Sequence, residues 1–193
     1  MPTPRKFTEE NIIDAALRLA SELGPAAVTV GAIAGDLQAP IGSIYHRFKS
    51  RDVLLGEAWL RTVEDFQAGF LKALNEPDTD SAGLQAALYT PRWVRKYPTQ
   101  ARILLLYRRE DFYSNGWSAG MAERAERLGS ELHNGLQEFA RHYLGSAEKR
   151  NMQKLAFAIV DLPYAAVRRY VAKGEKPPLL VDEMVRIAYL AIM

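Results

Sequence analysis

Two short helical segments separated by a tight break, at residues 29–48, constrain the fold of this chain more than any other part of its sequence. Thr29 is a good helix N-cap, because its hydroxyl can accept a hydrogen bond from a free amide of the first turn. The apolar residues that follow have the spacing of one helical stripe: Val30, Ile33, Ala34 and Leu37. After a break at Gln38, Pro40 suits the first position of a second short helix. Two helices joined so tightly predict a helix-turn-helix, whose second helix can enter the major groove of DNA.

The segments around this helix-turn-helix complete a distinctive order of features. FTEENIIDAALRLASELG, at residues 7–24, predicts an amphipathic first helix, and Ser50 can cap a long helix that opens with RDVLL. The second helix of the pair carries GSIYHRF, at residues 42–48. This order resembles the TetR family of bacterial transcriptional regulators over about the first third of the chain. The resemblance implies an all-α fold, with an N-terminal three-helix, helix-turn-helix DNA-binding domain followed by a helical ligand-binding and dimerisation domain.

Helical patterns continue to the end of the chain, and no segment shows the period of two that is typical of a strand. Helices are predicted at residues 8–23, 30–37, 40–47, 51–74, 82–96, 99–112, 118–144, 147–173 and 179–192. The polar segment NEPDTDS, at residues 75–81, is the clearest internal boundary. We expect a DNA-binding domain at residues 5–65, with its helix-turn-helix at 29–48, and a helical effector-binding and dimerisation domain at residues 66–193.

The composition narrows the class of protein without identifying a partner. A net charge of +2 is too small to indicate a nucleic-acid partner by itself, but Arg47, Lys49 and Arg51 cluster beside the predicted recognition helix. The chain has no cysteine, so neither disulfide bonds nor a thiolate metal site is available. There is no signal-peptide pattern and no run of about 18 apolar residues, so we expect a cytoplasmic protein without a membrane partner.

The family pattern and this charge cluster together predict a set of DNA contacts. The expected contacts are Thr29, Ile41, Gly42, Ser43, Tyr45, His46, Arg47, Lys49 and Arg51. Arg5 and Lys6 are expected to form an arm along the DNA backbone. Tyr45 can equally be a core residue with only its hydroxyl exposed, and both interpretations remain open. Ile44 and Phe48 are expected to be structural.

Several positions depart from the usual pattern of the family. Gln38 stands where a turn glycine is common, Gly31 stands where a longer polar side chain is frequent, and Pro40 and Ile41 replace a frequent Ser-Lys pair. Because fewer polar side chains remain, we expect little hydrogen-bonded readout of bases. We predict instead that Ile41 packs on a thymine methyl group, an apolar contact available in the major groove. Packing of Ile41 against a neighbouring helix is the alternative.

The C-terminal helix is apolar on more than one side, and a helix that is apolar on most sides must be buried on most sides. A second copy of the chain is a natural cover, and the resemblance implies a homodimer formed through the last two long helices. The predicted interface residues are Leu155, Ile159, Leu162, Val167, Val181, Met184, Val185 and Ala188. The alternative is that these residues close the core of a monomer. A kink is predicted at Pro163.

Aromatic residues are frequent after residue 58, and rings with polar tips suit a ligand cavity between helices. The resemblance implies such a cavity for a small-molecule effector, and the predicted lining residues are Trp59, Phe66, Tyr89, Trp93, Tyr107, Trp117 and Tyr164. For each ring, packing in the core is the alternative. No cofactor, metal site or catalytic residue is predicted: His133 and His142 lack a third ligand at useful spacing, and no phosphate-binding loop, nucleophile elbow or HExxH is present.

Taken together, the sequence predicts a non-enzymatic, DNA-binding transcriptional regulator that acts as a homodimeric repressor and is released from an inverted-repeat operator by a small-molecule effector. Two other classes remain open. One is a helical scaffold of this family that binds a protein partner without binding DNA, which the residues Gly31, Pro40 and Ile41 motivate. The other is a small helical enzyme that uses the aromatic cavity. The sequence specifies neither the effector nor the operator.

Overall fold

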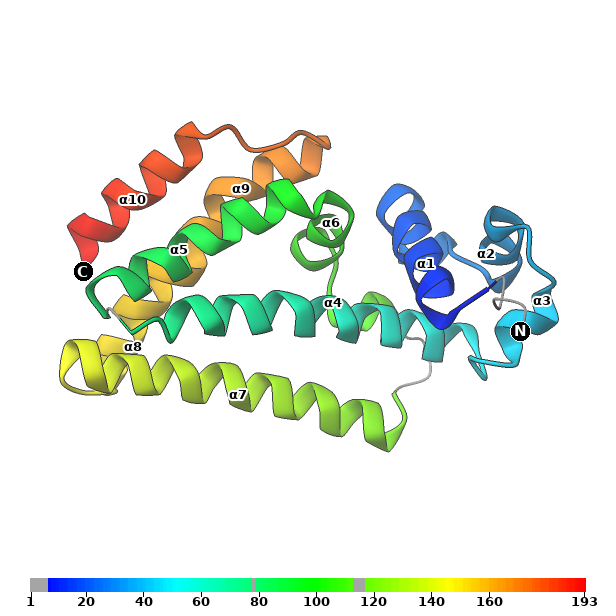
Figure 1. The fold of residues 1–193 in the computed structure, drawn as a ribbon, viewed down its shortest axis with the longest axis horizontal. Helices are drawn as coiled ribbons and strands as arrows, with labels where there is room; N and C mark the ends of the chain where they lie inside the picture. The colour runs from blue at the N-terminus through cyan, green and yellow to red at the C-terminus, as the bar shows by residue number, and fades with distance from the viewer. Residues whose placement is uncertain (1–6, 78, 113–116) are drawn as a thin grey trace, which may run out of the picture.

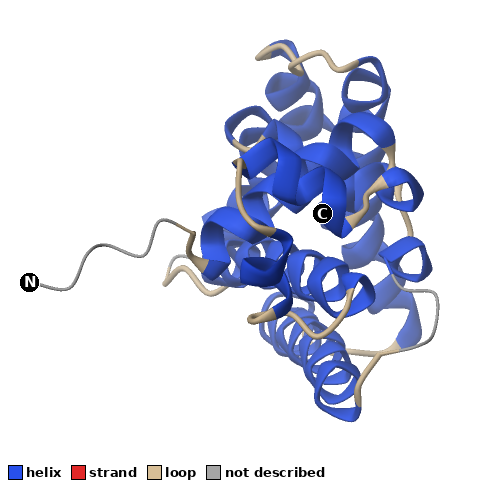
Figure 2. Cartoon of the chain, turned by 90° about the vertical axis from the view of Figure 1, so that its right-hand side faces the viewer, coloured by secondary structure: helices blue, strands red, loops and turns tan. Residues whose placement is uncertain are grey.

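The computed structural model describes residues 7–77, 79–112 and 117–193, and these residues form helices and loops without a strand (Figure 1, Figure 2). The helices of the N-terminal part are α1 (Glu9–Leu23), α2 (Val30–Leu37), α3 (Ile41–Tyr45) and α4 (Arg51–Leu74). They are followed by α5 (Thr79–Lys96), α6 (Pro98–Leu106), α7 (Ala119–Leu144), α8 (Lys149–Ala156), α9 (Leu162–Lys173) and α10 (Leu180–Ile192). The predicted all-α fold is confirmed. Among the described helices, none is long and apolar enough to cross a membrane.

Three helices of the N-terminal part, α1, α2 and α4, begin at side-chain caps that satisfy free backbone amides. Thr8 and Asn11 form a reciprocal pair at the start of α1, in which each side-chain oxygen accepts a hydrogen bond from the backbone N–H of the other. The Thr29 hydroxyl accepts from the amide of Ala32 at 3.0 Å, and Ser50 caps α4 in the same way. The predicted caps at Thr29 and Ser50 are therefore confirmed. Pro40 differs from the prediction by one position, because it is the N-cap of α3 and the helix begins at Ile41.

The long helix α4 runs through the molecule and contributes to two separate hydrophobic cores (Figure 1). Its first turns pack against α1, α2 and α3, where Ile12, Ile33, Ile44 and Leu54 are completely buried. Its last turns pack against α5 and α7, and Phe70 and Leu74 join the larger core of the C-terminal helices. Any movement of α4 therefore changes contacts in both cores.

Two predicted helices are interrupted in the structure. The helix predicted at 99–112 ends at Leu106, and a 3₁₀ turn follows at Arg109–Phe112. The interruption is stabilised locally, because the Asp111 carboxylate accepts a hydrogen bond from the backbone amide of Arg108 at 2.7 Å. The helix predicted at 147–173 contains a π-helical segment, Phe157–Asp161, immediately before the kink predicted at Pro163. A proline lacks an N–H and its ring clashes with the carbonyl four residues earlier, so a wider turn before it relieves that conflict.

Candidate DNA interface and effector cavity

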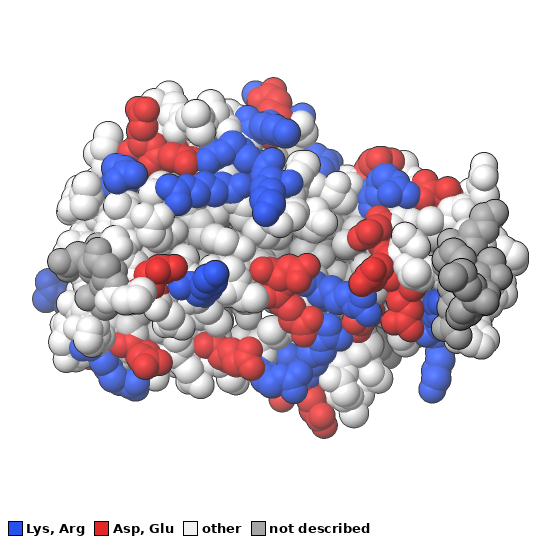
Figure 3. Space-filling view, viewed as in Figure 1, with Lys and Arg blue, Asp and Glu red and all other residues white. Residues whose placement is uncertain are grey.

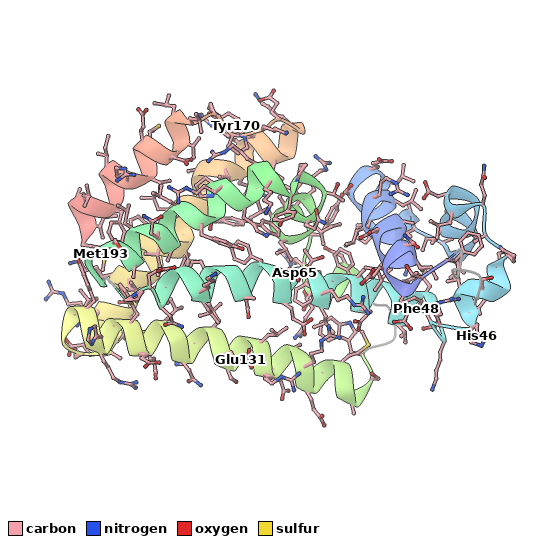
Figure 4. All side chains as sticks on the ribbon, viewed as in Figure 1. His46, Phe48, Asp65, Glu131, Tyr170 and Met193 are labelled. Atoms are coloured by element: carbon pink, nitrogen blue, oxygen red, sulfur yellow. The ribbon has the colours of Figure 1, made fainter. Side chains whose placement is uncertain are left out.

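The helix α3, the predicted recognition helix, presents one side to the core and the other to the exterior. Ile44 is completely buried and Phe48, just beyond the helix, is 5% exposed. On the opposite side, Ile41 is 49% exposed and Tyr45 is 53% exposed. Figure 4 shows the same division, with His46 at the outer edge of the molecule and Phe48 directed inward. Of the two interpretations of Tyr45, the structure therefore favours the exposed one.

The basic residues after α3 have different environments. Lys49 is exposed and no hydrogen bond or ion pair engages its side chain among the described residues. Arg47 is half-buried and donates a hydrogen bond to the carbonyl of Ser43 at 2.8 Å. The guanidinium of Arg51 donates to the backbone carbonyls of Pro25 and Val28.

In this conformation the guanidinium of Arg51 is engaged within the chain, so its predicted contact with a phosphate gains no support here and stays a prediction. Its side chain lies between the 3₁₀ turn at Pro25–Ala27 and the start of α4, and it is only 28% exposed. The prediction used only the position of Arg51 next to the helix cap. The carbonyls that accept its hydrogen bonds belong to residues more than twenty positions earlier in the chain. Arg51 ties the segment before α2 to α4.

A surface hollow of about 710 Å³ lies between the N-terminus of α1 and α3. Its lining residues are Thr8, Glu9, Gly42, Ser43, His46 and Arg47. It brings four predicted DNA contacts next to the first amides of α1, and the N-terminus of a helix favours anions such as phosphate. Arg5 and Lys6, which are predicted to form a DNA-binding arm, lie outside the described residues.

The tight turn before α3 depends on a residue in the left-handed conformation. Gln38 ends α2 with φ 51° and ψ 39°, and it is the one non-glycine with positive φ among the described residues. Glycine is the usual residue in this conformation, because a Cβ atom is crowded there. The departure at Gln38 therefore places a non-glycine residue in a crowded backbone conformation.

A second candidate site is an apolar cavity of about 170 Å³ enclosed by α4, α5, α6 and the α8–α9 segment. Its lining residues are Phe66, Thr90, Trp93, Val94, Leu104, Leu105, Val160 and Tyr164. The ring of Phe66 meets the ring of Trp93 edge-to-face, with centroids 5.0 Å apart. The Tyr164 hydroxyl donates a hydrogen bond to the carbonyl of Leu105 at 3.0 Å.

The structure places three of the seven predicted lining residues, Phe66, Trp93 and Tyr164, around this cavity. Tyr89 lies behind Phe66, with ring centroids 5.5 Å apart. The rings of Trp59 and Trp117 pack together beside the α4–α7 interface, with centroids 5.5 Å apart. The ring of Tyr107 packs on Phe112 in the N-terminal core.

The predicted cavity positions of Trp59, Tyr107 and Trp117 are therefore not supported, because these rings fill other interfaces. The cavity residues that the sequence analysis missed are mostly aliphatic: Thr90, Val94, Leu104, Leu105 and Val160. Aromatic residues mark only part of the cavity wall in the sequence, and the apolar run ILLL at residues 103–106 is the sequence signal for part of the remaining wall.

Two pKa values are displaced beside the cavity. Burial and the neighbouring Glu64 raise the pKa of Asp65, although Arg61 opposes them. Burial, Tyr97 and Asp65 raise the pKa of Tyr89, so its phenol stays neutral. Asp65 is exposed on α4 and is not among the lining residues (Figure 4). Neither group supplies a charge to the interior of the cavity.

The predicted dimer interface divides into two faces in the structure. Leu155, Ile159, Val167, Val181 and Val185 are at most 3% exposed and belong to the core of the single chain. The alternative that they close the core of the single chain therefore describes their packing, although Val181 and Val185 also line the groove between α9 and α10, and their part in a subunit interface stays a prediction. Among the other predicted interface residues, Met184 is 57% exposed, and Leu162 and Ala188 are half-buried.

A second apolar stripe of α10 faces outward. Leu180, Met184, Ile187 and Leu190 are between 57% and 68% exposed and follow one another at helical spacing. Beside Met184, a groove of about 390 Å³ separates α9 from α10. Large apolar side chains that share one exposed helix face mark an interaction surface more often than scattered ones do.

An ion-pair network joins α7 to the start of α4 and to α1. Arg124 binds Glu64 and also donates to the carboxylate of Glu57 at 2.7 Å, while Arg61 donates to Glu57 at 2.8 Å and lies 3.6 Å from Glu9. Burial alone would raise the pKa of Glu57, but the hydrogen bonds from Arg61 and Arg124 outweigh it and lower this pKa below 4.5. The hydrogen bond with Glu64 raises the pKa of Arg124. Figure 3 shows opposite charges gathered in this central region.

Within the described ranges, no group of three or more His, Cys, Asp or Glu side chains is arranged to hold a metal ion. His133 contacts Gln137 at 2.9 Å on the exposed side of α7. This contact joins two neighbouring turns on the surface of one helix and does not form a metal site.

Residues 12–58 match the family model described as bacterial regulatory proteins, tetR family. No curated protein matches the chain by sequence.

Solved structures of TetR-type regulators share the fold over nearly the whole chain. The regulator PfmR from Thermus thermophilus has a TM-score of 0.72 at 18% identity, with 96% of this chain and 95% of PfmR covered. FadR from Bacillus subtilis, solved in complex with stearoyl-CoA, has a TM-score of 0.71 at 14% identity, with coverage of 96% and 100%. A TetR family regulator from Marinobacter aquaeolei has a TM-score of 0.69 at 16% identity, with coverage of 95% and 92%. The N-terminal segment of the chain thus matches the TetR family of transcriptional regulators, and the chain as a whole has the fold of solved TetR-type regulators.

Proposed function

We propose that this protein is a repressor that binds an inverted-repeat DNA operator as a homodimer and is released by a small-molecule effector. The observation that carries the proposal is the outward face of α3, where Ile41, Tyr45 and His46 are exposed while Ile44 and Phe48 hold the helix to its core. A recognition helix needs this arrangement, because base contacts require free side chains on a fixed backbone. In this proposal residues 5–65 bind DNA, and residues 66–193 bind the effector and dimerise.

The exposed stripe of α10 supports the dimer. A two-fold axis that pairs this stripe with its copy would bury four large apolar side chains on each protomer. The same axis would relate the two recognition helices, which should enter major grooves about 34–36 Å apart or at a multiple of that spacing. An inverted-repeat operator follows from this symmetry.

The position of the cavity supports release by an effector. One wall of the cavity is Phe66 of α4, and the same helix packs against the DNA-binding helices through Leu54. A ligand that changes the position of α4 would change the separation of the two recognition helices, with a coupling free energy of about 1–3 kcal/mol. Since coupling is reciprocal, operator DNA should weaken effector binding by the same factor. FadR of B. subtilis binds stearoyl-CoA, so an acyl-CoA is one effector class to be tested.

The first experiment is a selection of the purified protein against random duplex DNA at near-physiological salt. We expect enrichment of a palindrome, which would identify the operator. If none is enriched, the selection is repeated after unfolding, dialysis and refolding to remove a copurified effector. A second failure would overturn the proposal and favour a protein partner.

A matched pair of lysine variants tests where DNA binds. Lys49→Ala should weaken binding uniformly across sequences and reduce the slope of log affinity against log salt by about one. Lys72→Ala removes another exposed lysine, from the far end of α4, and should leave both quantities unchanged. Equal effects of the two substitutions would exclude Lys49 as a phosphate contact.

A further inference from the structure

The cavity between α4, α5, α6 and α9 limits the chemistry of its ligand. We propose that the effector is a small, uncharged, mainly apolar molecule with the size of one substituted aromatic ring and one hydrogen-bonding group. The regulatory role of this ligand rests on the proposed function. Its binding to the cavity does not, because the cavity can be tested without DNA. The size, the charge and the shape of the cavity all support this inference.

The volume of the cavity sets the size of the ligand. It measures about 170 Å³. An apolar protein cavity of about 150 Å³ accommodates benzene, whereas sites for drug-sized ligands measure about 300–1,000 Å³. One ring with a short substituent therefore fills the space. The acyl chain and nucleotide of a long-chain acyl-CoA do not fit in it.

The charge around the cavity excludes an anion. None of its lining residues is charged. The nearby arginines are already engaged, since Arg95 forms two hydrogen bonds with Asp182 at 2.8 and 2.7 Å. Arg102 donates to the carbonyls of Ser21 and Val171, each at 2.9 Å. A carboxylate or phosphate in the cavity would lose its hydration without gaining a counter-charge, which is strongly unfavourable.

The shape and the polar atoms of the cavity favour a ring with a single polar substituent. Phe66 and Trp93 meet edge-to-face, so their rings offer the geometry in which a third aromatic ring packs well. Thr90 contributes a hydroxyl from a position that is only 6% exposed. The Tyr164 hydroxyl donates to Leu105 and can still accept a hydrogen bond from a ligand. Tyr164 is 38% exposed, which places the mouth of the cavity beside it.

Isothermal titration calorimetry of the full chain without DNA tests this inference. The probes are benzyl alcohol and p-cresol as neutral rings, toluene as a ring without a polar group, benzoate as an anion of similar size, and stearoyl-CoA. We expect the two neutral polar probes to bind once per chain. Benzoate should bind at least about tenfold more weakly, because its carboxylate would be unpaired in the cavity.

Two substitutions locate the binding. Val160→Phe should fill the cavity and weaken the neutral probes at least about tenfold. Leu23→Phe adds the same ring at a position that is 61% exposed on α1 and should change nothing. If Val160→Phe does not fold, Thr90→Val is nearly isosteric and should weaken benzyl alcohol without weakening toluene.

The inference is overturned if benzoate or stearoyl-CoA binds as tightly as benzyl alcohol, if neither neutral polar probe binds, or if the cavity variants that fold bind the probes normally. Its failure is distinguishable from failure of the proposed function. An operator enriched by a protein that binds no neutral ring would preserve the DNA-binding proposal and remove this ligand class. Neutral rings that bind without releasing the operator would preserve the ligand class and remove its role as an effector.

Discussion

At the scale of single residues, the turn of the helix-turn-helix is formed with an unfavourable backbone conformation. Gln38 has φ 51°, in the region where an L-residue is crowded and glycine is not. The residues that follow it, Pro40 and Ile41, are also departures from the family's pattern. The turn nevertheless brings α3 into position, because Ile44 and Phe48 are anchored in the core. The strain at one residue is offset by burial at two others.

Gln38→Gly should therefore stabilise the protein. Relief of the left-handed strain exceeds the larger chain entropy of glycine, and we expect the free energy of unfolding to rise by about 0.5–1 kcal/mol. Thermal or urea unfolding measures it. Gln38→Ala is the control, because alanine keeps the Cβ atom and should give no gain. If the glycine and alanine variants were equally stable, backbone strain at this turn would be refuted.

Ile41→Ala tests how the exposed face of α3 reads DNA. Ile41 is 49% exposed, so packing against a neighbouring helix does not explain its side chain. Loss of a contact with a thymine methyl group should reduce the preference for thymine at one position of each half-site, by about 1 kcal/mol, without lowering stability. The DNA selection repeated with the variant measures this preference. An unchanged base preference would contradict the methyl contact.

At the scale of secondary-structure elements, α4 is held by α7 as well as by the two cores. Arg124 of α7 bridges Glu57 and Glu64 of α4, and Arg61 extends the network toward Glu9 of α1. These pairs are partly exposed, so each is expected to contribute modestly to stability. Their common effect is to fix the part of α4 that lies between the cavity and the DNA-binding helices.

Glu57→Gln should lower the free energy of unfolding by about 1 kcal/mol at pH 7, because it removes the charge from two hydrogen bonds. The pKa of Glu57 is lowered in the folded state, so its stabilisation is present above pH 4.5 and is lost as the pH falls through the folded pKa. The difference between wild type and variant should therefore shrink at pH 3.5. Urea unfolding at both pH values measures it.

Glu126→Gln is the control for this experiment, because Glu126 is exposed on α7 and no ion pair engages it among the described residues. Its effect should stay within about 0.5 kcal/mol at either pH. A Glu57→Gln difference that grows as the pH falls would contradict the assigned direction of the pKa.

At the scale of the whole molecule, α10 has one apolar side in the core of the chain and another apolar side on its exterior. Val181, Val185 and Tyr189 close the core of the chain, and Leu180, Met184 and Ile187 lie on the exterior. The helix is thus apolar on two sides for two different reasons. The first side is apolar because it packs in the core of the single chain. The second side is exposed in the single chain and would be covered in the proposed dimer.

Ile187→Asp should separate the dimer without unfolding the chain, because Ile187 is 68% exposed in the single chain. A buried unpaired carboxylate on each side of the two-fold axis would be strongly unfavourable. Analytical ultracentrifugation should show a dimer for wild type and a monomer for the variant, and operator affinity should fall with it. Leu23→Asp, at a position 61% exposed on α1, should remain dimeric. A dimeric Ile187→Asp variant would exclude this face of α10 as the interface.

Local patterns in the sequence were sufficient for most of the helices, for the caps at Thr29 and Ser50 and for the inward side of α3, but not for the interruptions after Leu106 and at Phe157–Asp161. Thr29 and Ser50 cap the helices that they precede, and Ile44 and Phe48 are buried, because caps and helical periodicity depend on residues within about one turn. Local patterns also carried the resemblance to the family.

Only the tertiary structure decided the neighbours of each side chain, which differ between residues of the same chemical type. It directed Arg51 to the carbonyls of Pro25 and Val28, and it separated Trp93, which lines the cavity, from Trp59, which does not. It also divided α10 into a buried stripe and an exposed one. The physical reason is the same in each case: a side chain's chemical type sets what it can bind, but its partner is set by the packing of segments that are distant in the sequence.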